Sequence, residues 1–494
     1  MTIKKMGLGL IGTGLLVIFA SILVDLLPGG KPGIQSAQIL GIELALLTLL
    51  LGLWATLSAA DGKIDLAGQA RRGLKWFLQL PVIVWVLIGF FIAYLLFSVS
   101  PMFLDPSLRM TYFNRYLPDM SPIGNDLLIV IELMKGWFLE DRSPYELQFY
   151  PPFTYMFFAP LLLVDDYTAL YRLFTLFSLV SYCFLTLILP AKMVDNRNLP
   201  LVLLFFVTGL SSYGLQFELE RGQYNVFTFL LCLWAIYIFH YYPRYRIFAY
   251  LLFSISVQLK IYPAIFIVMF IDNWRAWKDI LLRFAGIALF NILLLFIMGF
   301  RIFLDFLAML STQLSTPGWT WNGNHSINAF VFNFAKDGFR LVSPATLEVL
   351  QQNAGLLENL LLLIYIIAFV SALLIAYRRD TGSPDPYLLL TCMIGALIIP
   401  ISNDYTLSIL AAPVALLLSN VPGMRNIPQR LLAISLVLGI SFAYASVLVP
   451  FKYKPYYLNN AFTALFLILL CATVLNLLRY KTAEVPIDGN ESRA

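Results

Sequence analysis

Charged side chains are scarce in this sequence. Asp, Glu, Lys and Arg together make up 12% of its 494 residues, whereas 60% are hydrophobic and the mean hydropathy is +0.81. A soluble domain carries about 25% charged residues, and a soluble chain of this length could not bury so much apolar surface. The scarcity of charge excludes a soluble enzyme, a secreted disulfide scaffold, a disordered chain and a nucleic-acid binder. We therefore expect an all-α polytopic membrane protein.

Histidine and cysteine are rare as well. The two histidines, His240 and His325, argue against a histidine-based metal site, and each of the four cysteines lies alone in an apolar run. We expect buried thiols without disulfides, and neither a metal nor a cofactor. The net charge of +5 reflects basic cytoplasmic loops rather than a site for a polyanion. Aromatic residues, by contrast, reach 15%, which suits interfacial belts and contact with sugar or lipid.

Long apolar runs dominate the chain. A helix needs about 20 apolar residues to span a bilayer, and we expect about 12 such helices. They should lie near residues 7–24, 37–59, 76–98, 168–190, 200–213, 225–241, 279–299, 356–376, 386–401, 405–419, 430–449 and 460–478. Two further runs are interrupted by proline. We expect 151–164 to be re-entrant or shallow, and 247–271 to be a hairpin of half-spans broken near Lys260–Pro263.

Lys and Arg in short loops predict the orientation, because cytoplasmic loops are enriched in them. The basic loops are Lys4–Lys5, Arg71–Lys75, Tyr242–Arg246, Arg275–Lys278, Tyr377–Arg379, Arg425–Arg430 and Arg479–Lys481. All of them should be cytoplasmic. The run 247–271 has basic loops on both flanks, so both of its ends should lie on that side. The long loops 99–150 and 300–355 then fall on the outer side.

The first long loop contains an amphipathic stretch. One face of it, at helical spacing, carries Leu127, Val130, Ile131, Met134, Trp137 and Phe138. This pattern predicts a helix on the outer membrane surface. Asp126 falls in its first turn, where the helix dipole favours a carboxylate. The spacing alone leaves Asp126 open as a functional carboxylate or as a plain helix cap.

Two tyrosines follow in the same loop. Tyr145 and Tyr150 lie near the double proline Pro151–Pro152, which cannot continue a helix and keeps Tyr150 extended. The loop should turn back toward the membrane here. A turn without further function is the alternative.

A third polar stretch separates two apolar runs. It contains Arg221, Gln223 and Asn225. Amides at the start of an apolar span are costly unless they bond to something, so they are candidate ligand contacts, and a solvated hairpin with a cap is the alternative. Arg221 could pair with Glu218 or Glu220.

Lys260 is the most informative single residue. It lies in the middle of the apolar run 247–271, where a charged group is expensive and suggests a function. A helix broken at Pro263 would point the ammonium group into a cavity, and its expected partner is a phosphate or an acidic side chain. Snorkelling to the membrane surface is the alternative.

The second long loop places tryptophans beside amides and hydroxyls, between residues 319 and 328. Indole rings can stack on the C–H faces of sugars while amides satisfy sugar hydroxyls, so Trp321, Asn324 and Ser326 are candidate sugar contacts. His325 could donate to a phosphate. An ordinary interfacial loop is the alternative.

A short outer turn precedes the run 405–419. It contains Asp404 and Tyr405. Asp404 could help to form the same cavity, or it could cap the helix that we expect to begin at Tyr405.

These motifs occur in an order that is typical of a known family. The set is Asp126; Gly136 with Pro144–Tyr145; Tyr150–Pro152; Gly222–Gln223 with Asn225; Lys260 with Pro263; Asn324 with Ser326; and Ser402 with Asp404–Tyr405. Over about residues 120–410, this ordered set resembles the bacterial GT-C glycosyltransferases of family eighty-seven. That family holds polyprenol-phosphate-mannose-dependent mannosyltransferases and related arabinofuranosyltransferases.

The resemblance implies a GT-C fold with re-entrant half-helices and outer juxtamembrane helices. It implies transfer of a sugar, mannose or another pentose or hexose, from a polyprenyl-phosphate donor to a glycan or lipid acceptor. The reaction would take place on the outer side of the cell membrane, with inversion and with Asp126 as general base. Lys260, Arg221 and His325 would bind the donor phosphate. The implied substrate contacts are Tyr145, Tyr150, Gln223, Asn225, Trp321, Asn324, Ser326, Asp404 and Tyr405.

The expected organisation has four parts. Residues 1–75 form two extra N-terminal transmembrane helices, 76–410 the catalytic module with both long loops, 411–479 the C-terminal transmembrane helices, and 480–494 a cytoplasmic tail. Two other functions stay open at this point. A transporter or flippase of lipid-linked glycans would also have broken helices and a buried lysine, and a glycan ligase or polymerase could share the fold.

Overall fold

The chain falls into two units. The computed structural model describes residues 9–17, 76–94, 123–145, 150–194, 196–210, 212–315, 323–337, 343–380, 382–399, 401–410, 427–446 and 461–483, with positions 45, 48 and 73. One unit comprises Met1–Trp85 with Tyr94–Arg109, and the other comprises Val86–Ala93 with Met110–Ala494. In the first unit, residues 9–17 are helical. The second unit contains every candidate site residue.

The described residues are helical, which confirms the all-α prediction for this part of the chain. The long elements are α7 (Asn125–Glu140), α9 (Tyr167–Cys183), α11 (Leu199–Leu210), α13 (Asn225–Tyr241), α14 (Arg246–Leu259), α15 (Trp277–Leu295), α16 (Phe300–Ser315), α19 (Ala354–Arg379), α20 (Pro386–Ile398), α22 (Ile427–Ser446) and α24 (Phe462–Ala483). The shorter ones include α8 (Pro152–Phe158), α12 (Tyr213–Arg221), α17 (Ile327–Asp337) and α18 (Pro344–Gln352). Between described residues, the only β-pairing is one isolated bridge.

Three described helices are long and apolar enough to cross a membrane. They are Tyr167–Met193, Ala354–Arg379 and Phe462–Tyr480, and two bent helix pairs raise the number to five. The expected total of about 12 stays a prediction, because the run 37–59 and residues 411–419 lie largely outside the described residues. One expectation was wrong within them: the start of the run 405–419 is not an α-helix but the 3₁₀ helix η12, Asp404–Leu410.

The proline-interrupted run 151–164 is short, as expected. It forms α8 and then the 3₁₀ helix η5, Ala159–Leu163. At the usual rises of the two helix types, these elements together cover roughly 20 Å, less than the hydrocarbon core. The second long loop is largely helical: α15 bends by 102° into α16, and α17 and α18 follow.

The run 247–271 is a hairpin, as its basic flanks predicted. α14 runs to Lys260 at the tip of the hairpin, and the 3₁₀ helix η9 (Tyr262–Phe270) runs back from it. At the tip, the hydroxyl of Tyr262 donates to the carbonyl of Asn225 at the start of α13, 3.2 Å away. At the open end, Arg246 lies 2.5 Å from Asp272 in an ion pair. Both ends of the hairpin therefore share one end of the helix bundle, and Lys260 lies at the other.

α13 forms the centre of the second unit. It is apolar around its whole circumference and packs against α9, α14, η9 and η12, as expected for a helix enclosed by others. Phenylalanine rings fill the space between α13 and the hairpin: Phe239 and Phe270 lie 5.2 Å apart between ring centroids, and Phe253 and Phe270 lie 4.7 Å apart. This core fixes the hairpin tip relative to the start of α13.

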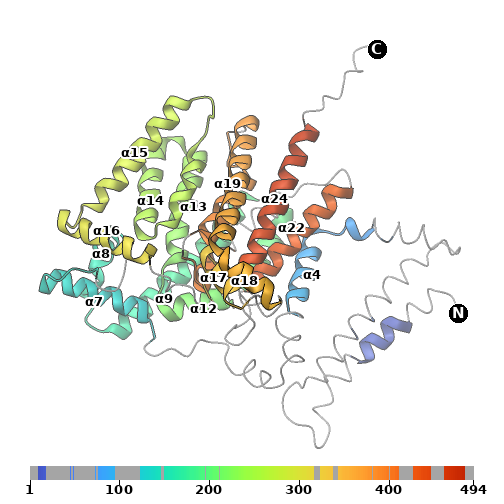
Figure 1. Cartoon of the computed structure of the whole chain (residues 1–494), viewed down its shortest axis with the longest axis horizontal. Coiled ribbons are helices and arrows are strands. Elements are labelled where there is room, and N and C mark those ends of the chain that lie inside the picture. The colour runs from blue at the N-terminus through green and yellow to red at the C-terminus, as the bar shows by residue number, and fades with distance from the viewer. Residues whose placement is uncertain are drawn as a thin grey trace, which may run out of the picture. The chain divides into compact units, whose positions relative to one another are not determined.

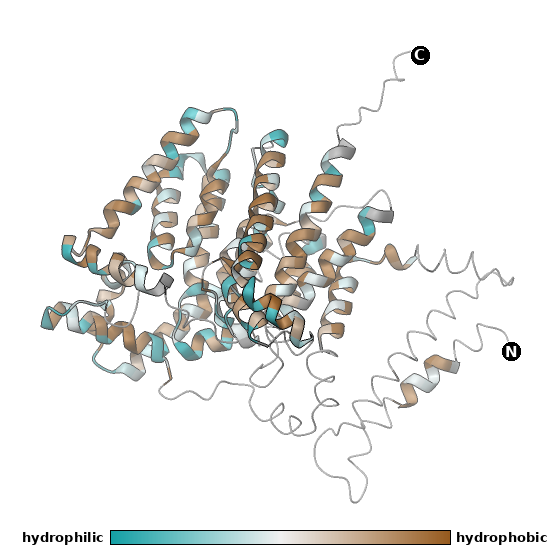
Figure 2. Cartoon of the chain, in the orientation of Figure 1, coloured by the Kyte–Doolittle hydropathy of each residue, from teal (hydrophilic) through white to brown (hydrophobic). Residues whose placement is uncertain are grey.

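The two ends of the second unit differ in composition. At one end, α7, α8, α12 and α16 gather beside the hairpin tip (Figure 1). The other end carries the basic termini of the long helices, and Figure 2 shows hydrophilic residues there on α15 and α19, with hydrophobic residues along their length. This pattern matches helices that cross a bilayer and end in its polar zone.

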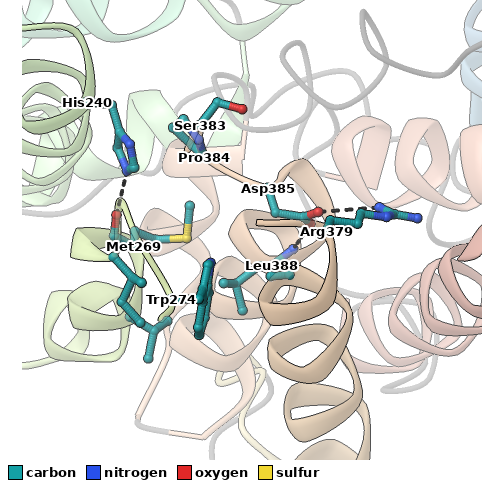
Figure 3. Close-up of a pocket in the computed structure, with 11 residues that line it drawn as sticks. His240, Met269, Trp274, Arg379, Ser383, Pro384, Asp385 and Leu388 are labelled. Atoms are coloured by element: carbon teal, nitrogen blue, oxygen red, sulfur yellow. Dashed lines mark hydrogen bonds and ion pairs between the residues drawn. The ribbon is translucent and has the colours of Figure 1, made fainter. Parts of the chain in front are cut away.

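Polar contacts tie the basic end together (Figure 3). Ring nitrogens of His240 lie 2.7 Å from the carbonyl oxygen of Met269 and 3.2 Å from that of Gly382. Arg379 donates to the carboxylate of Asp385 over 3.4 Å. His240 thus joins the open end of the hairpin to the segment between α19 and α20.

Candidate active site

Asp126 lies in the first turn of α7, as the sequence predicted. Gly124 precedes the helix with φ +76°, and its N–H donates to the carbonyl of Glu220 in α12, 2.6 Å away. The carboxylate of Asp126 is buried and accepts hydrogen bonds from Arg221 and Gln223. Gly124, not Asp126, occupies the N-cap position, and the carboxylate of Asp126 is aimed at side chains of the α12–α13 turn.

Gln223 bridges Asp126 and Lys260. α12 ends at Gly222, and α13 begins two residues after Gln223. The amide nitrogen of Gln223 donates to Oδ2 of Asp126 at 2.5 Å, and its amide oxygen accepts from Nζ of Lys260 at 2.8 Å. One amide thereby holds a carboxylate and an ammonium group in a single hydrogen-bonded network.

Lys260 follows α14 directly, in an extended conformation that ends the helix. Its ammonium nitrogen lies 4.4 Å from the ring centroid of Tyr150 and 4.6 Å from that of Tyr224, and it donates to the hydroxyl of Tyr150 over 3.3 Å. Aromatic faces attract a cation in this geometry. The side chain thus points at polar and aromatic partners, which argues against snorkelling.

We call Asp126, Tyr150, Arg221, Gln223 and Lys260 the Asp126 cluster. It contains two cations and one carboxylate. Burial raises the pKa of Tyr150 to about 12, with the negative charge of Asp126 adding to the effect. The phenol therefore stays protonated at neutral pH and can donate as well as accept. An ammonium group has three N–H bonds, and Lys260 directs two of them at Tyr150 and Gln223, which leaves the third without a hydrogen-bond partner among the described residues.

A second group forms where residues 324–326 meet residues 402–404. Asn324 and Asn403 form the isolated bridge, and the N–H of His325 donates to the carbonyl of Ser402 at 2.7 Å. The side-chain oxygen of Asn324 accepts from the N–H groups of Ser326 and Ser402, at 3.0 and 3.2 Å. The segment 324–326 is thereby fixed against the turn that contains Asp404. We call Asn324, His325, Ser326, Ser402, Asn403 and Asp404 the His325 cluster.

His325 is fully buried, and both of its ring nitrogens have partners. Nδ1 accepts from the N–H of Ala461 at 3.0 Å, so the ring proton can lie on Nε2, which is 2.7 Å from a carboxylate oxygen of Asp404. Burial raises the pKa of Asp404, and the hydrogen bond from His325 opposes that rise. Here His325 holds protein groups together and directs neither nitrogen at the Asp126 cluster.

Tyr405 connects the two clusters. Its hydroxyl accepts from the amide of Asn403 at 2.6 Å, and its ring lies 5.6 Å from that of Phe217 in α12. The phenol of Tyr405 also lies close enough to the ammonium group of Lys260 to interact with it electrostatically.

Comparison with known protein families shows which family the chain belongs to. The model of glycosyltransferase family 87 matches residues 149–400, about half of the chain. The chain belongs to glycosyltransferase family 87. It is therefore a glycosyltransferase enzyme, and its apolar helices make it a membrane glycosyltransferase. Searches of curated proteins and of solved structures find no match.

The family 87 match covers Tyr150, Arg221, Gln223 and Lys260 but begins after Asp126. The resemblance noted in the sequence extended further, to about residues 120–410. Asp126 joins the candidate site through its contacts instead: it accepts from Arg221 and Gln223, which lie inside the matched region.

Other predicted contacts of the family 87 enzyme occupy different positions. Tyr145 is buried, and its hydroxyl donates to the carbonyl of Tyr150 at 2.9 Å. This bond fixes the backbone at Tyr150. Asn225 is buried at the start of α13, and its amide nitrogen has no hydrogen-bond partner among the described residues. Trp321 lies outside the described residues.

Two residues of this glycosyltransferase site were missed or misjudged in the sequence. Tyr224 was missed, although its position between two amides at a span start was a usable signal. Arg221 was expected to pair with Glu218 or Glu220. It pairs with Asp126, and the Glu218 alternative is wrong. The carboxylate of Glu218 accepts instead from the N–H of Val226 at 2.8 Å and from the hydroxyl of Ser408 at 2.5 Å. It thereby ties α12 to η12.

Gly222 lets α12 approach α7, and its replacement should disturb the site. Its φ is +68°, and a Cβ there would lie 2.7 Å from the Cβ of Leu127 in α7. We expect Gly222→Ala to lower the free energy of unfolding by about 1–3 kcal/mol, since a strained backbone and a clash act together. Thermal unfolding of the purified protein measures this.

The matched control for this prediction is Gly355→Ala in α19, where a Cβ would meet nothing within 4 Å. That variant should be as stable as the parent or more stable, because Ala favours a helix over Gly. Equal unfolding temperatures for Gly222→Ala and Gly355→Ala would contradict the packing role of Gly222.

Proposed function

We propose that this glycosyltransferase moves a sugar, mannose or another pentose or hexose, from a polyprenyl-phosphate donor to a glycan or lipid acceptor. The observation that supports this is the Gln223 bridge, which holds the carboxylate of Asp126 and the ammonium group of Lys260 in one network. Such a pair supplies a proton acceptor and an anion partner side by side. When the sugar is transferred, a lipid-linked donor releases a polyprenyl phosphate. The polyprenyl chain of the donor anchors it in the membrane.

In the proposed reaction, Asp126 accepts the proton of the acceptor hydroxyl as that oxygen attacks the anomeric carbon. The bond from the anomeric carbon to the phosphate oxygen breaks on the opposite face, so the configuration inverts. The electron pair of the broken bond leaves with the phosphate. Lys260 and Arg221 stabilise the negative charge that develops there. The benefit of Asp126 comes from its position against the acceptor.

The remaining contacts would shape the substrate pocket. Tyr150, Gln223 and Tyr405 line the approach to Lys260, and we propose that Asn225 offers its buried amide to the substrate. We assign His325 to a supporting role: with Asp404 it holds Asn324 and Ser326 in place, and these two would meet the sugar or acceptor. Trp321 would stack on a sugar ring of the substrate.

The site would face the outer side of the cell membrane. The hairpin tip with Lys260 lies at the end of the bundle opposite Arg246 and Asp272, and basic ends are typical of the cytoplasmic face. This placement supports a donor that is made inside and used outside, for a glycan of the cell envelope.

The donor class can be tested with the purified protein in lipid nanodiscs. Labelled polyprenyl-phosphate sugars and nucleotide sugars are supplied in separate reactions with a crude acceptor fraction, and the transferred label is counted. We expect transfer from a polyprenyl-phosphate sugar alone. Transfer from a nucleotide sugar in the absence of any polyprenyl-phosphate sugar would overturn the proposed donor class.

A further inference from the structure

A groove runs between α14 and α15, at the end of the bundle away from the Asp126 cluster. Its volume is about 430 Å³. The residues that line it include Ile247 of α14 and Asp279, Leu282, Arg283 and Gly286 of α15. We call it the α14–α15 groove. It is apolar along its length and polar at the mouth, where Asp279 and Arg283 lie.

The groove has free space over Gly286. A Cβ on Gly286 would meet no atom within 4 Å. The rims of the groove are exposed, with Ile247 at 77% and Leu282 at 75%. In a bundle that crosses a membrane, such a groove opens toward hydrocarbon, so its occupant is a lipid chain rather than a peptide or a soluble ligand.

The mouth of the groove carries an excess of positive charge. Arg246 and Arg283 both form ion pairs with one carboxylate, that of Asp272, at 2.5 and 3.0 Å. Two guanidinium groups therefore share one negative charge. Arg244 and Lys278 lie exposed on the two helix starts that border the mouth. Arg275 pairs with Asp380 at 3.8 Å beside the same segment. Together with Arg244, Arg246, Lys278 and Arg283, five cations therefore face three carboxylates, those of Asp272, Asp279 and Asp380.

Aromatic side chains mark the depth of this mouth. Tyr245 is 61% exposed, and Trp277 is 63% exposed. Exposed tyrosine and tryptophan at helix starts are typical of the headgroup level of a membrane. A phosphate held by the basic mouth would thus lie at the depth where lipid phosphates lie, with its chain in the apolar part of the groove.

We propose that the α14–α15 groove is a binding site for one anionic phospholipid of the membrane. One acyl chain lies over Gly286 between the two helices, and the headgroup phosphate pairs with the cations of the mouth, chiefly Lys278 and Arg244. Charge selects an anionic headgroup over a zwitterionic one, and the groove holds the chain. This site is separate from the Asp126 cluster and does not depend on the proposed reaction.

Native mass spectrometry of the protein in detergent, titrated with phosphatidylglycerol or phosphatidylcholine, tests the proposal. We expect one phosphatidylglycerol to bind at least about tenfold more tightly than phosphatidylcholine. Gly286→Phe fills the groove and should weaken phosphatidylglycerol binding roughly tenfold or more, because the displaced chain returns to detergent. Lys278→Ala with Arg244→Ala should remove most of the preference between the two lipids and leave chain binding in place.

The matched control is Ala288→Phe, which adds the same ring to an exposed position of α15 that does not line the groove. It should bind phosphatidylglycerol like the parent. Equal affinity for both lipids in the parent, or equal affinity in Gly286→Phe and Ala288→Phe, would overturn the proposal. Tighter binding of an uncharged polyprenol than of phosphatidylglycerol would also overturn it.

Discussion

Asp126→Asn should lower the kcat of sugar transfer by at least two orders of magnitude while the protein remains folded. The amide keeps the size of the carboxylate and can still meet Gln223, but it cannot accept the proton of the acceptor hydroxyl. General-base catalysis contributes on the order of 10²–10⁴ in rate, so we expect a loss of that size in kcat. Initial rates with a polyprenyl-phosphate sugar donor, with the unfolding temperature measured beside them, check this prediction.

Two further variants separate catalysis from folding. Asp126→Glu keeps the charge that Arg221 pairs with but displaces the carboxylate, so kcat should still fall strongly while stability stays near that of the parent. Asp141→Asn is the matched control: Asp141 ends the same helix with φ +51°, a conformation that Asn tolerates. Full activity in Asp126→Asn would refute the role of Asp126 as the base. So would a loss of kcat in Asp141→Asn as large as that in Asp126→Asn.

Lys260→Met should reduce transfer by roughly 10²–10³, the range seen when one donor to a developing anion is removed. Methionine keeps an apolar stem of similar length between the rings of Tyr150 and Tyr224 but cannot stabilise a leaving phosphate. Polyprenyl phosphate, the reaction product, should inhibit the enzyme, and its inhibition constant measures binding of the phosphate without any contribution from the sugar. Its inhibition constant should rise in Lys260→Met, while the KM for the acceptor stays unchanged.

Lys192→Met is the control for this experiment, because Lys192 is exposed in the last turn of α10 (Leu189–Met193) and contacts neither cluster. An unchanged inhibition constant in Lys260→Met would show that Lys260 does not bind the phosphate. A rise in the KM for the acceptor without any change in product inhibition would place Lys260 on the acceptor side instead.

Local patterns in the sequence predicted several elements of the site. The apolar periodicity after Gly124 placed Asp126 in the first turn of a helix, and α7 is that helix. Basic flanks with Lys260 and Pro263 between them predicted the hairpin and its break. Both predictions depend on residues that are neighbours in the chain, where helix geometry and the distribution of charge leave a readable trace.

Contacts between distant segments left no such trace. Gln223 joins Asp126 to Lys260, and nothing near Gln223 in the chain shows that its two amide ends have these partners. The sequence suggested that the ring of His325 could donate to a phosphate. In the structure its two nitrogens bond instead to the carboxylate of Asp404 and the N–H of Ala461. Side-chain pairing of this kind follows from the packing of whole helices.

The hairpin of α14 and η9 has a consequence for how the protein enters the membrane. A hairpin inserted from the side of its flanks must carry its tip, with Lys260, through the hydrocarbon. A charged residue at the centre of an inserting helix costs about 2.5–3.5 kcal/mol. η9 contains two Ile, two Phe and one Val, which together favour insertion by about 1.5–3 kcal/mol. The apolar returning arm therefore offsets most of the cost of delivering the lysine, so its hydrophobicity serves biosynthesis as well as packing.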